Sequence, residues 1–234
     1  MLYFREMLNG FSNKALFFIT LLILASCKKE SSVPDFHKDY FPLEKGNFVV
    51  YEVVEINHDI DNAIQHDTLS YQLKTVIGDT VIDNLGRVAR KFLRYKRVDT
   101  NGVWELSDVW TAIVDGTLAE LTEENQRIVK LVFPPSENKE WNPNSYTTLP
   151  TLEAHYVSIH APKTINSLVF DSTLTVELED YFSMVDYRRK FEVYAKGVGL
   201  IKKVYKDLII AGFDKTNVQK GKELELTCID FGVE

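Results

Sequence analysis

The sequence predicts an all-β protein in which one strongly curved antiparallel sheet of about ten strands forms a half-barrel or a barrel-like structure. Val, Ile, Thr, Tyr and Phe recur in alternating runs that Asp, Asn, Gly and Pro interrupt, as expected for half-buried strands separated by turns. No long segment shows helical periodicity. A β-sandwich is the alternative, because it also buries every second residue of each strand. The predicted strands are residues 47–57, 67–77, 87–98, 102–114, 126–133, 152–160, 168–180, 187–196, 200–211 and 222–230.

Two glycine-containing connections favour tight turns. Asn101 and Gly102 adopt positive φ at low cost and therefore predict a hairpin between the third and fourth runs. Gly197 and Gly199 flank a single valine, which favours a tight turn over a glycine bulge.

Two further segments are less regular. Residues 117–125 fit either one or two helical turns or a short strand. Residues 134–150 contain four prolines, which cannot donate hydrogen bonds to a sheet, so this segment predicts an extended loop over one end of the sheet. We expect Trp141 to hold that loop in place.

Charges near the C-terminal third predict the register of one hairpin. If Glu179 lies opposite Arg188, then Glu177 lies opposite Lys190 on the same face. Opposite charges paired across strands each contribute a few tenths of a kcal/mol. The sequence therefore predicts a hairpin over residues 173–195 with one solvated, charged face.

The first 26 residues predict an export signal. Arg5 and Lys14 accompany an apolar run, residues 15–25, which has the length of a signal-peptide core and is short for a membrane-spanning helix. The run ends in the letters LASC, which resemble a bacterial lipobox, in which the cysteine, here Cys27, is lipidated and becomes the new N-terminus. An uncleaved anchor and an ordinary signal peptide are the alternatives.

This interpretation divides the chain into three parts. Residues 1–26 are expected to be a lipoprotein signal peptide, residues 27–35 the lipidated cysteine with a polar tether, and residues 36–234 a single β domain. Two or more acyl chains hold a protein stably on a membrane. We therefore expect an outer-membrane lipoprotein of the cell envelope, on either the periplasmic or the surface face.

Charge and thiol content narrow the class of partner. The whole chain has 27 Lys and Arg against 34 Asp and Glu, and residues 1–26 hold only Arg5, Lys14 and Glu6, so the remainder carries a net charge of −8. An acidic domain disfavours nucleic acid and anionic headgroups as primary partners. If Cys27 is lipidated, Cys228 is the only remaining thiol, and its alternating apolar context predicts a buried residue.

The candidate ligand-binding residues are Trp104 and Trp110. Side chains two residues apart share a face of a strand, so these tryptophans are expected on one face together with Asp108. One interpretation is an aromatic platform for a sugar or a lipid inside the curved sheet. The alternative interpretation is ordinary core, because sheets readily bury tryptophan.

No catalytic or metal motif stands out. His155 and His160 are separated by an odd number of residues and are expected on opposite faces of a strand. His58, Asp59 and Asp61 lie in a polar segment without the ligand spacing of a calcium loop, so a solvated loop is favoured. We expect no metal, no cofactor and no enzymatic activity.

Three Asp-Ser/Thr pairs resemble acceptor sites for O-glycosylation in Bacteroidota envelope proteins. The acceptors would be Thr68, Thr80 and Ser172. The alternative is that Asp-Thr is simply common where a turn enters a strand.

Three stretches carry a wider resemblance. They are residues 40–51 (YFPLEKGNFVVY), residues 127–134 with 141–144 (RIVKLVFP and WNPN), and residues 194–201 (YAKGVGLI). They resemble a group of uncharacterised lipoproteins of Bacteroidota, which implies a β-rich domain outside the cytoplasm with no assigned activity. A looser likeness is to periplasmic half-barrels of the lipoprotein-carrier kind, which present an apolar concave face.

The expected function is a membrane-anchored, non-enzymatic binding or accessory module that holds a lipid or a glycan on an apolar concave face. A structural subunit of an outer-membrane protein complex is one alternative, with an exposed apolar patch meeting its partner. A hydrolase of envelope glycans or lipids is another, and it would need convergent polar groups with perturbed pKa values in one cleft.

Overall fold

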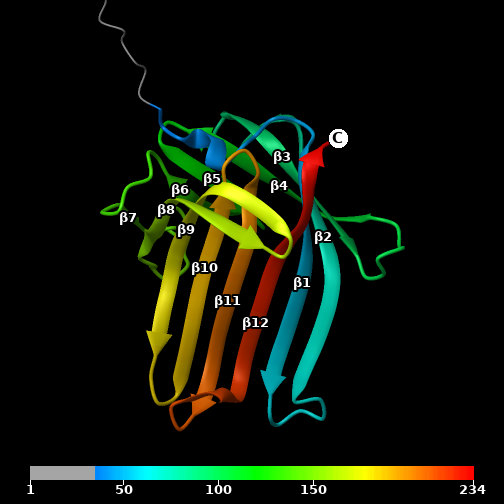
Figure 1. Cartoon of the computed structure of the whole chain (residues 1–234), viewed down its shortest axis with the longest axis vertical. Coiled ribbons are helices and arrows are strands. Elements are labelled where there is room, and N and C mark those ends of the chain that lie inside the picture. The colour runs from blue at the N-terminus through cyan, green and yellow to red at the C-terminus, as the bar shows by residue number, and fades with distance from the viewer. Residues whose placement is uncertain (1–34) are drawn as a thin grey trace, which may run out of the picture. The chain divides into compact units, whose positions relative to one another are not determined.

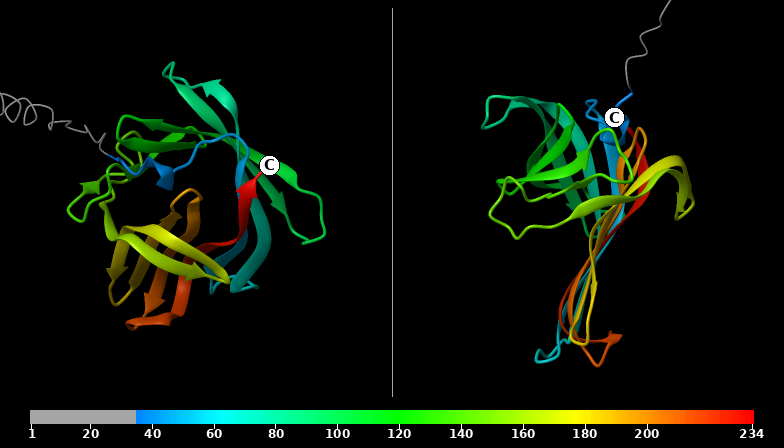
Figure 2. Two further views of the ribbon diagram at one scale, coloured as in Figure 1. Left: turned by 45° about the horizontal axis from the view of Figure 1, so that its top comes forward. Right: turned by 90° about the vertical axis from the view of Figure 1, so that its left-hand side faces the viewer.

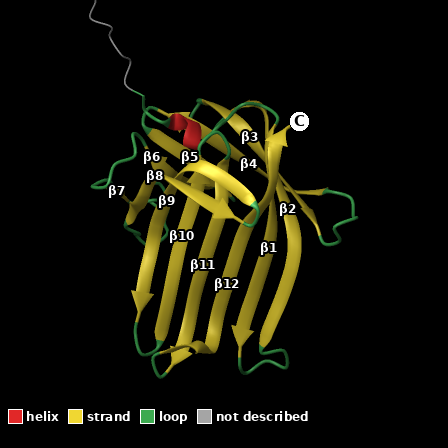
Figure 3. Ribbon diagram, in the orientation of Figure 1, coloured by secondary structure: helices red, strands yellow, loops and turns green. Residues whose placement is uncertain are grey.

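The computed structural model describes residues 35–234, of which Phe36–Glu234 form one compact unit. Within this unit a short 3-10 helix, η1 (Lys38–Tyr40), precedes a single antiparallel sheet of twelve strands (Figures 1 and 3). The prediction of an all-β fold with one strongly curved, barrel-like sheet is confirmed, with twelve strands in place of about ten. One continuous sheet also rules out the sandwich.

The sheet consists of two antiparallel meanders that are joined in its middle, where the first and last strands of the chain pair. Its order is β6-β5-β4-β3-β2-β1-β12-β11-β10-β9-β8-β7, so each strand lies beside its sequence neighbours except at β6 and β7, which are the two edges of the sheet, and β1 also pairs with β12. The strands are β1 (Asn47–Asp59), β2 (His66–Ile82), β3 (Val88–Arg97), β4 (Glu105–Asp115), β5 (Leu118–Glu123), β6 (Gln126–Val132), β7 (Glu140–Trp141), β8 (Ala154–Ile165), β9 (Leu168–Phe182), β10 (Asp186–Ala195), β11 (Gly199–Ala211) and β12 (Asp214–Val233).

Two of the twelve strands lie in segments that the sequence left ambiguous or assigned to a loop. Residues 117–125 contain β5, which confirms the short strand over the helical turns. The loop predicted over residues 134–150 contains the two-residue strand β7. The glycine pair Gly197 and Gly199 forms the predicted tight turn between β10 and β11, and both residues have positive φ.

The register predicted for the β9–β10 hairpin is wrong by two residues. Glu179 lies opposite Lys190 in place of Arg188, and the register shifts by one residue immediately after Lys190. Such a bulge sets two residues of one strand against one of the other, and alternation alone does not reveal it. The pairing of opposite charges is still present, because Glu179 lies 2.7 Å from Lys190 and 3.2 Å from Arg188.

The two edges of the sheet meet through hydrogen bonds at β6. The backbone N–H of Val129 donates to the carbonyl of Pro143 at 2.9 Å, and the indole N–H of Trp141 donates to the carbonyl of Val129 at 3.1 Å. The Tyr156 hydroxyl of β8 accepts from the N–H of Val132 and donates to its carbonyl. These contacts nearly close the sheet into a barrel, and they hold the Trp141 loop as predicted.

The β8–β9 hairpin crosses the outside of the sheet. In Figure 1 its yellow tip passes in front of β10, β11 and β12. There Asn166 donates from its side-chain amide to the carbonyl of Cys228, and Phe170 packs on Phe231 with ring centroids 5.5 Å apart. The hairpin therefore covers the outer face of these strands and buries Cys228 completely.

The long strands extend beyond the barrel as a single layer (Figure 2, right). Cross-strand ion pairs lie along this layer, including Lys220 with Asp59 at 3.3 Å and Lys190 with Asp207 at 3.1 Å. β12 passes very close to β11 at Gly221, where a Cβ would lie 2.1 Å from the carbonyl oxygen of Asp207. Only glycine fits this close approach, and its φ of +131° is also one that other residues rarely adopt.

Candidate ligand-binding cavity

The concave face of the sheet encloses a cavity of about 520 Å3. This volume lies within the range of roughly 300–1,000 Å3 typical of small-molecule sites. Strands from both halves of the barrel contribute, because inward-facing residues alternate along each strand. The aromatic and aliphatic lining residues are Tyr51, Tyr71, Leu73, Phe92, Trp110, Leu121, Ile128, Leu149, Leu200, Leu224 and Leu226.

A smaller apolar recess of about 60 Å3 adjoins the cavity and shares several lining residues with it. The segment that leads from η1 into β1 forms part of its wall, with Phe41 and Leu43. Tyr51 lies between the two spaces and donates its hydroxyl proton to the carbonyl of Leu200 at 2.7 Å. The cavity therefore combines an apolar end with a more polar main chamber.

A buried ion-pair group forms one side of the main chamber. The ammonium nitrogen of Lys130 lies 2.9 Å from Glu192 and 3.1 Å from Glu123, and the ammonium of Lys203 lies 3.7 Å from Glu192. Tyr194 donates its hydroxyl proton to the second oxygen of Glu192. Burial by itself would raise the pKa of Glu192, but the two lysines outweigh it and hold that pKa at about 2.

The same balance acts on the other members of the group. Burial opposes the charge on Lys130, yet Glu123 and Glu192 outweigh burial and raise its pKa. Burial also opposes the charge on Glu123, and the lysines lower its pKa. Each shift favours the charged form, so these three groups keep their charges at neutral pH.

Arg94 and Trp110 form a second polar feature of the lining. The guanidinium carbon of Arg94 lies 3.9 Å from the Trp110 ring centroid, which is a cation–π contact. Arg94 also pairs with Asp108 at 3.2 Å, and Phe92 lies nearly parallel to Trp110 with the ring centroids 6.4 Å apart. The contacts with Arg94 and Phe92 fix the orientation of the Trp110 ring.

The lining charges balance. The cavity is lined by four acidic and four basic side chains, namely Glu55, Glu123, Glu124 and Glu192 with Arg94, Lys130, Lys203 and Lys222. Most of them pair with one another or with Asp108, as the distances above show. A ligand in this space would therefore meet aromatic rings and hydrogen-bonding groups without a net charge.

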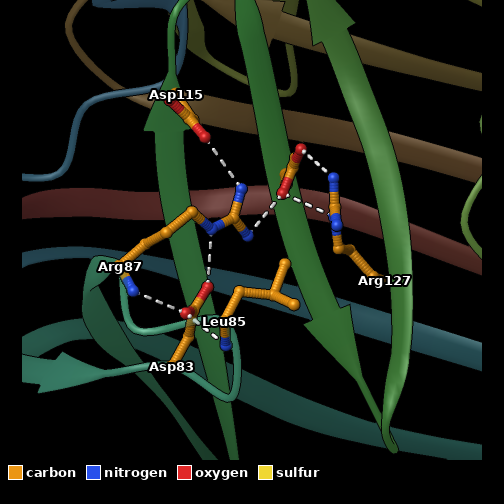
Figure 4. Close-up of polar contacts among 6 residues, drawn as sticks. Asp83, Leu85, Arg87, Asp115 and Arg127 are labelled. Carbon is orange, nitrogen blue, oxygen red and sulfur yellow. Dashed lines mark hydrogen bonds and ion pairs between the residues drawn. The ribbon is translucent and has the colours of Figure 1, made fainter.

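A separate ion-pair network braces the barrel away from the cavity (Figure 4). Arg87, in the β2–β3 turn, reaches Asp83 at 2.8 Å, Asp115 at 3.0 Å and Glu120 at 2.9 Å. Arg127 of β6 reaches the same Glu120 at 2.8 Å from the other side. Glu120 is only 1 % exposed, so its two arginines compensate the cost of burying its charge and connect the turn to β5 and β6.

The structure separates the two tryptophans that the sequence grouped. Trp110 lines the cavity, whereas Trp104 lies outside it, with its ring 4.2 Å from the guanidinium carbon of Arg97. Trp104 precedes β4, and the β3–β4 register shifts between Arg94 and Tyr95, so the regular alternation does not extend to it. Of the two residues, only Trp110 therefore lies where the platform interpretation requires it, and ligand binding stays a prediction.

The remaining predicted sites have different surroundings. Thr68 and Thr80 are exposed on β2, whereas the Ser172 hydroxyl lies 2.6 Å from the hydroxyl of Tyr40 and is partly buried. Glycosylation at these positions stays a prediction. Cys27 and the predicted signal peptide lie outside the described residues.

The ion-pair group of the cavity was missed from sequence, although a signal was present. Lys130 interrupts the apolar run of residues 128–133, and Glu192 lies between Phe191 and Val193. A charged residue inside an apolar run is rarely buried without a partner. That rule predicts a partner for each residue, but it does not predict that they partner one another across 62 residues of sequence.

Within residues 35–234 no group of three or more His, Cys, Asp or Glu side chains is placed to hold a metal ion, and no helix is long and apolar enough to cross a membrane. The fold and cavity define a barrel-like β protein with an amphipathic interior. No protein-family model and no curated protein matches the chain.

Proposed function

We propose that this protein is a non-enzymatic binding module of the cell envelope that holds a small lipid or glycan in the barrel cavity. The observation that supports this most directly is the chamber of about 520 Å3 with Trp110, Tyr71, Phe92 and Tyr51 in its lining. Aromatic walls with a few fixed polar groups are typical of small-molecule sites.

The charge pattern indicates which ligands suit the cavity. Because the lining charges balance, a strongly anionic or cationic ligand gains little net attraction there. A neutral or zwitterionic amphiphile instead matches an apolar recess next to a chamber with hydrogen-bonding walls. Sugars also suit this lining, because their apolar ring faces stack on aromatic side chains while their hydroxyls bond to carboxylates and cations.

The pKa shifts favour binding over catalysis. A general acid or base needs a pKa near the working pH. Glu123 and Glu192 shift downward and Lys130 shifts upward, which moves all three away from neutrality. These three groups therefore do not suit the role of general acid or base, because exchanging a proton at neutral pH would work against their ion pairs.

The proposed location is the outer membrane, with the domain held through acyl chains on Cys27. Its support is the apolar run of residues 15–25 and the lipobox-like ending. Intact-mass measurement of the protein from its own host tests this part separately. The expected mass is that of residues 27–234 plus acyl groups, and a Cys27→Ala chain should remain unprocessed.

Native mass spectrometry of the full chain, purified from its host envelope, tests the binding function. We expect a co-purifying lipid or glycan that is lost in Trp110→Leu and retained in Trp104→Leu. The second variant is a matched control, because it removes the same side chain from outside the cavity. A wild-type protein that is empty under conditions preserving other known complexes would count against the proposal.

A second candidate is a structural subunit that meets a protein partner through the free end of the sheet. Turns at this end (bottom of Figure 1) lie together, because Phe213 N–H donates to the Met184 carbonyl and Ile60 N–H to the Gln219 carbonyl. They expose a cluster of apolar side chains, which marks interaction surfaces. These residues are Ile60, Ile64, Phe182, Met184, Val185, Ile209 and Phe213.

Photo-crosslinking in the host distinguishes this candidate. A crosslinker at Phe213 should capture one defined envelope protein, whereas a crosslinker at Val103, which is 83 % exposed between β3 and β4, should not. Equal labelling from both positions would contradict a specific partner at this end.

A further inference from the structure

Two histidines that are not part of the cavity lining face each other across the β1–β2 hairpin. His58 of β1 lies directly opposite His66 of β2, beside the turn at the bottom of Figure 1. Their Nδ1 atoms are 2.8 Å apart. His58 is 9 % exposed, whereas His66 is exposed. The ring of His58 is therefore fixed by its surroundings, and the ring of His66 is accessible to solvent.

Glu223 of β12 determines the tautomer of His58. A carboxylate only accepts hydrogen bonds, so the contact of 3.1 Å between His58 Nε2 and Glu223 places a proton on Nε2. In neutral His58 this leaves the Nδ1 lone pair directed at His66. Glu223 also forms an ion pair with Lys206, which holds the carboxylate in place and offsets its charge.

We propose that His58 and His66 form a two-histidine site for a transition-metal ion such as Zn2+ or Cu2+, with Glu223 as the group that orients His58. With this tautomer of His58, the 2.8 Å contact requires Nδ1–H of His66 to donate to Nδ1 of His58, and a metal ion bound to both nitrogens would replace that proton. Neutral imidazole is a preferred ligand of these metals. A ligating histidine that gives its other N–H to a carboxylate is the usual arrangement around such ions.

The geometry requires a small adjustment. Two nitrogens about 2.0–2.1 Å from a tetrahedral Zn2+ lie roughly 3.3 Å apart, so the Nδ1 atoms must separate by roughly 0.5 Å. The exposed ring of His66 can rotate to provide this, and in its neutral form its proton moves from Nδ1 to Nε2 without net proton release. Two protein nitrogens leave coordination positions open for water or for a ligand from another molecule.

Isothermal titration of the full chain with Zn2+ at pH 7.5, with Cu2+ electron paramagnetic resonance beside it, tests the site. We expect one binding event that His66→Gln removes and a Cu2+ spectrum with coupling to two nitrogens. Glu223→Gln should weaken binding by about 10–100-fold, the effect typical of losing a group that orients a ligand. Binding should also weaken as the pH falls, because protons compete for imidazole.

Two control variants make the result specific. His155→Gln removes a histidine that also lies near a carboxylate, Glu177 at 3.7 Å, but has no facing histidine, and should leave the event intact. His37→Gln removes one ring of the other close pair, whose centroids with His160 are 4.5 Å apart, and should also leave it intact. Binding that survives His66→Gln, or that is lost in His37→Gln instead, would overturn the proposal.

Discussion

Replacing Lys130 by methionine tests the cavity wall most directly, because it removes the cation between Glu123 and Glu192 while keeping the length of the side chain. Glu192 is 2 % exposed and would keep only Lys203, at 3.7 Å, as a cation. Removing one partner of a buried pair costs about 3–5 kcal/mol. Because Lys203 remains, we expect the lower end, about 3 kcal/mol.

The pKa of Glu192 leads to the same magnitude. Its fall from an ordinary value of 4.5 to about 2 corresponds to about 3 kcal/mol of differential stabilisation. Because the folded-state pKa lies below the unfolded one, this stabilisation is complete above about pH 4.5 and disappears as the pH falls toward 2. The free energy of unfolding of Lys130→Met should therefore be lower than that of the wild type at pH 7. It should also fall less than that of the wild type as the pH is lowered below about 4.5.

Urea unfolding followed by tryptophan fluorescence, from pH 7 down to pH 3, measures both effects. The double variant Lys130→Met/Glu192→Gln is the control, because it removes both charges of the pair. It should recover a substantial part of the loss at pH 7, since no anion at position 192 remains buried. A loss below about 0.5 kcal/mol in the single variant, as for ordinary surface changes, would refute the reasoning.

Three further predictions follow from particular contacts. Gly221→Ala should cost about 3 kcal/mol or more in urea unfolding, whereas Gly86→Ala, which also has positive φ but no atom within 4 Å of its Cβ position, should cost only about 1 kcal/mol; equal costs would contradict the close approach. Burial raises the pKa of Cys228 to about 12, so in a Cys27→Ser chain iodoacetamide at pH 8 should leave the native thiol unmodified and alkylate it in urea; rapid native alkylation would contradict its burial. Glu120→Leu should lower the free energy of unfolding by about 2 kcal/mol, because Arg87 and Arg127, both partly exposed, lose their shared partner. An unchanged midpoint in urea unfolding would contradict a stabilising role for this network.

The strands were predictable because each buries one face, and burial imposes alternation on the sequence. All ten predicted runs contain strands, and the tight turn at Gly197 connects the expected neighbours. The third and fourth runs are also neighbours, but residues 98–104 join them in a longer connection, and neither Asn101 nor Gly102 has positive φ. The register of β9 with β10 was not predictable, since the bulge after Lys190 leaves the local composition unchanged. β7 also escaped prediction, because two residues such as Glu140 and Trp141 show no periodicity.

The cavity was only partly predictable for a different reason. Trp110 follows the alternation of β4 and therefore lies inside the curved sheet as expected. Lys130 and Glu192 belong to strands far apart in sequence, and only the curvature of the sheet brings β6 and β10 face to face. Curvature depends on the bulges and on the near-closure between β6 and the β7–β8 edge, which are properties of the whole sheet and not of any segment.

The long strands allow the two proposed roles to coexist in one molecule. β1 and β12 line the cavity with Tyr51 and Leu226 and then continue into the single layer beyond it, where Asp59 pairs with Lys220. The apolar turns at the other end of these strands, such as the one with Phe213, are absent from the cavity lining and keep their exposure whether the cavity is filled or empty. The proposed ligand binding and the proposed partner contact therefore involve different surfaces of the same strands, and neither proposal excludes the other.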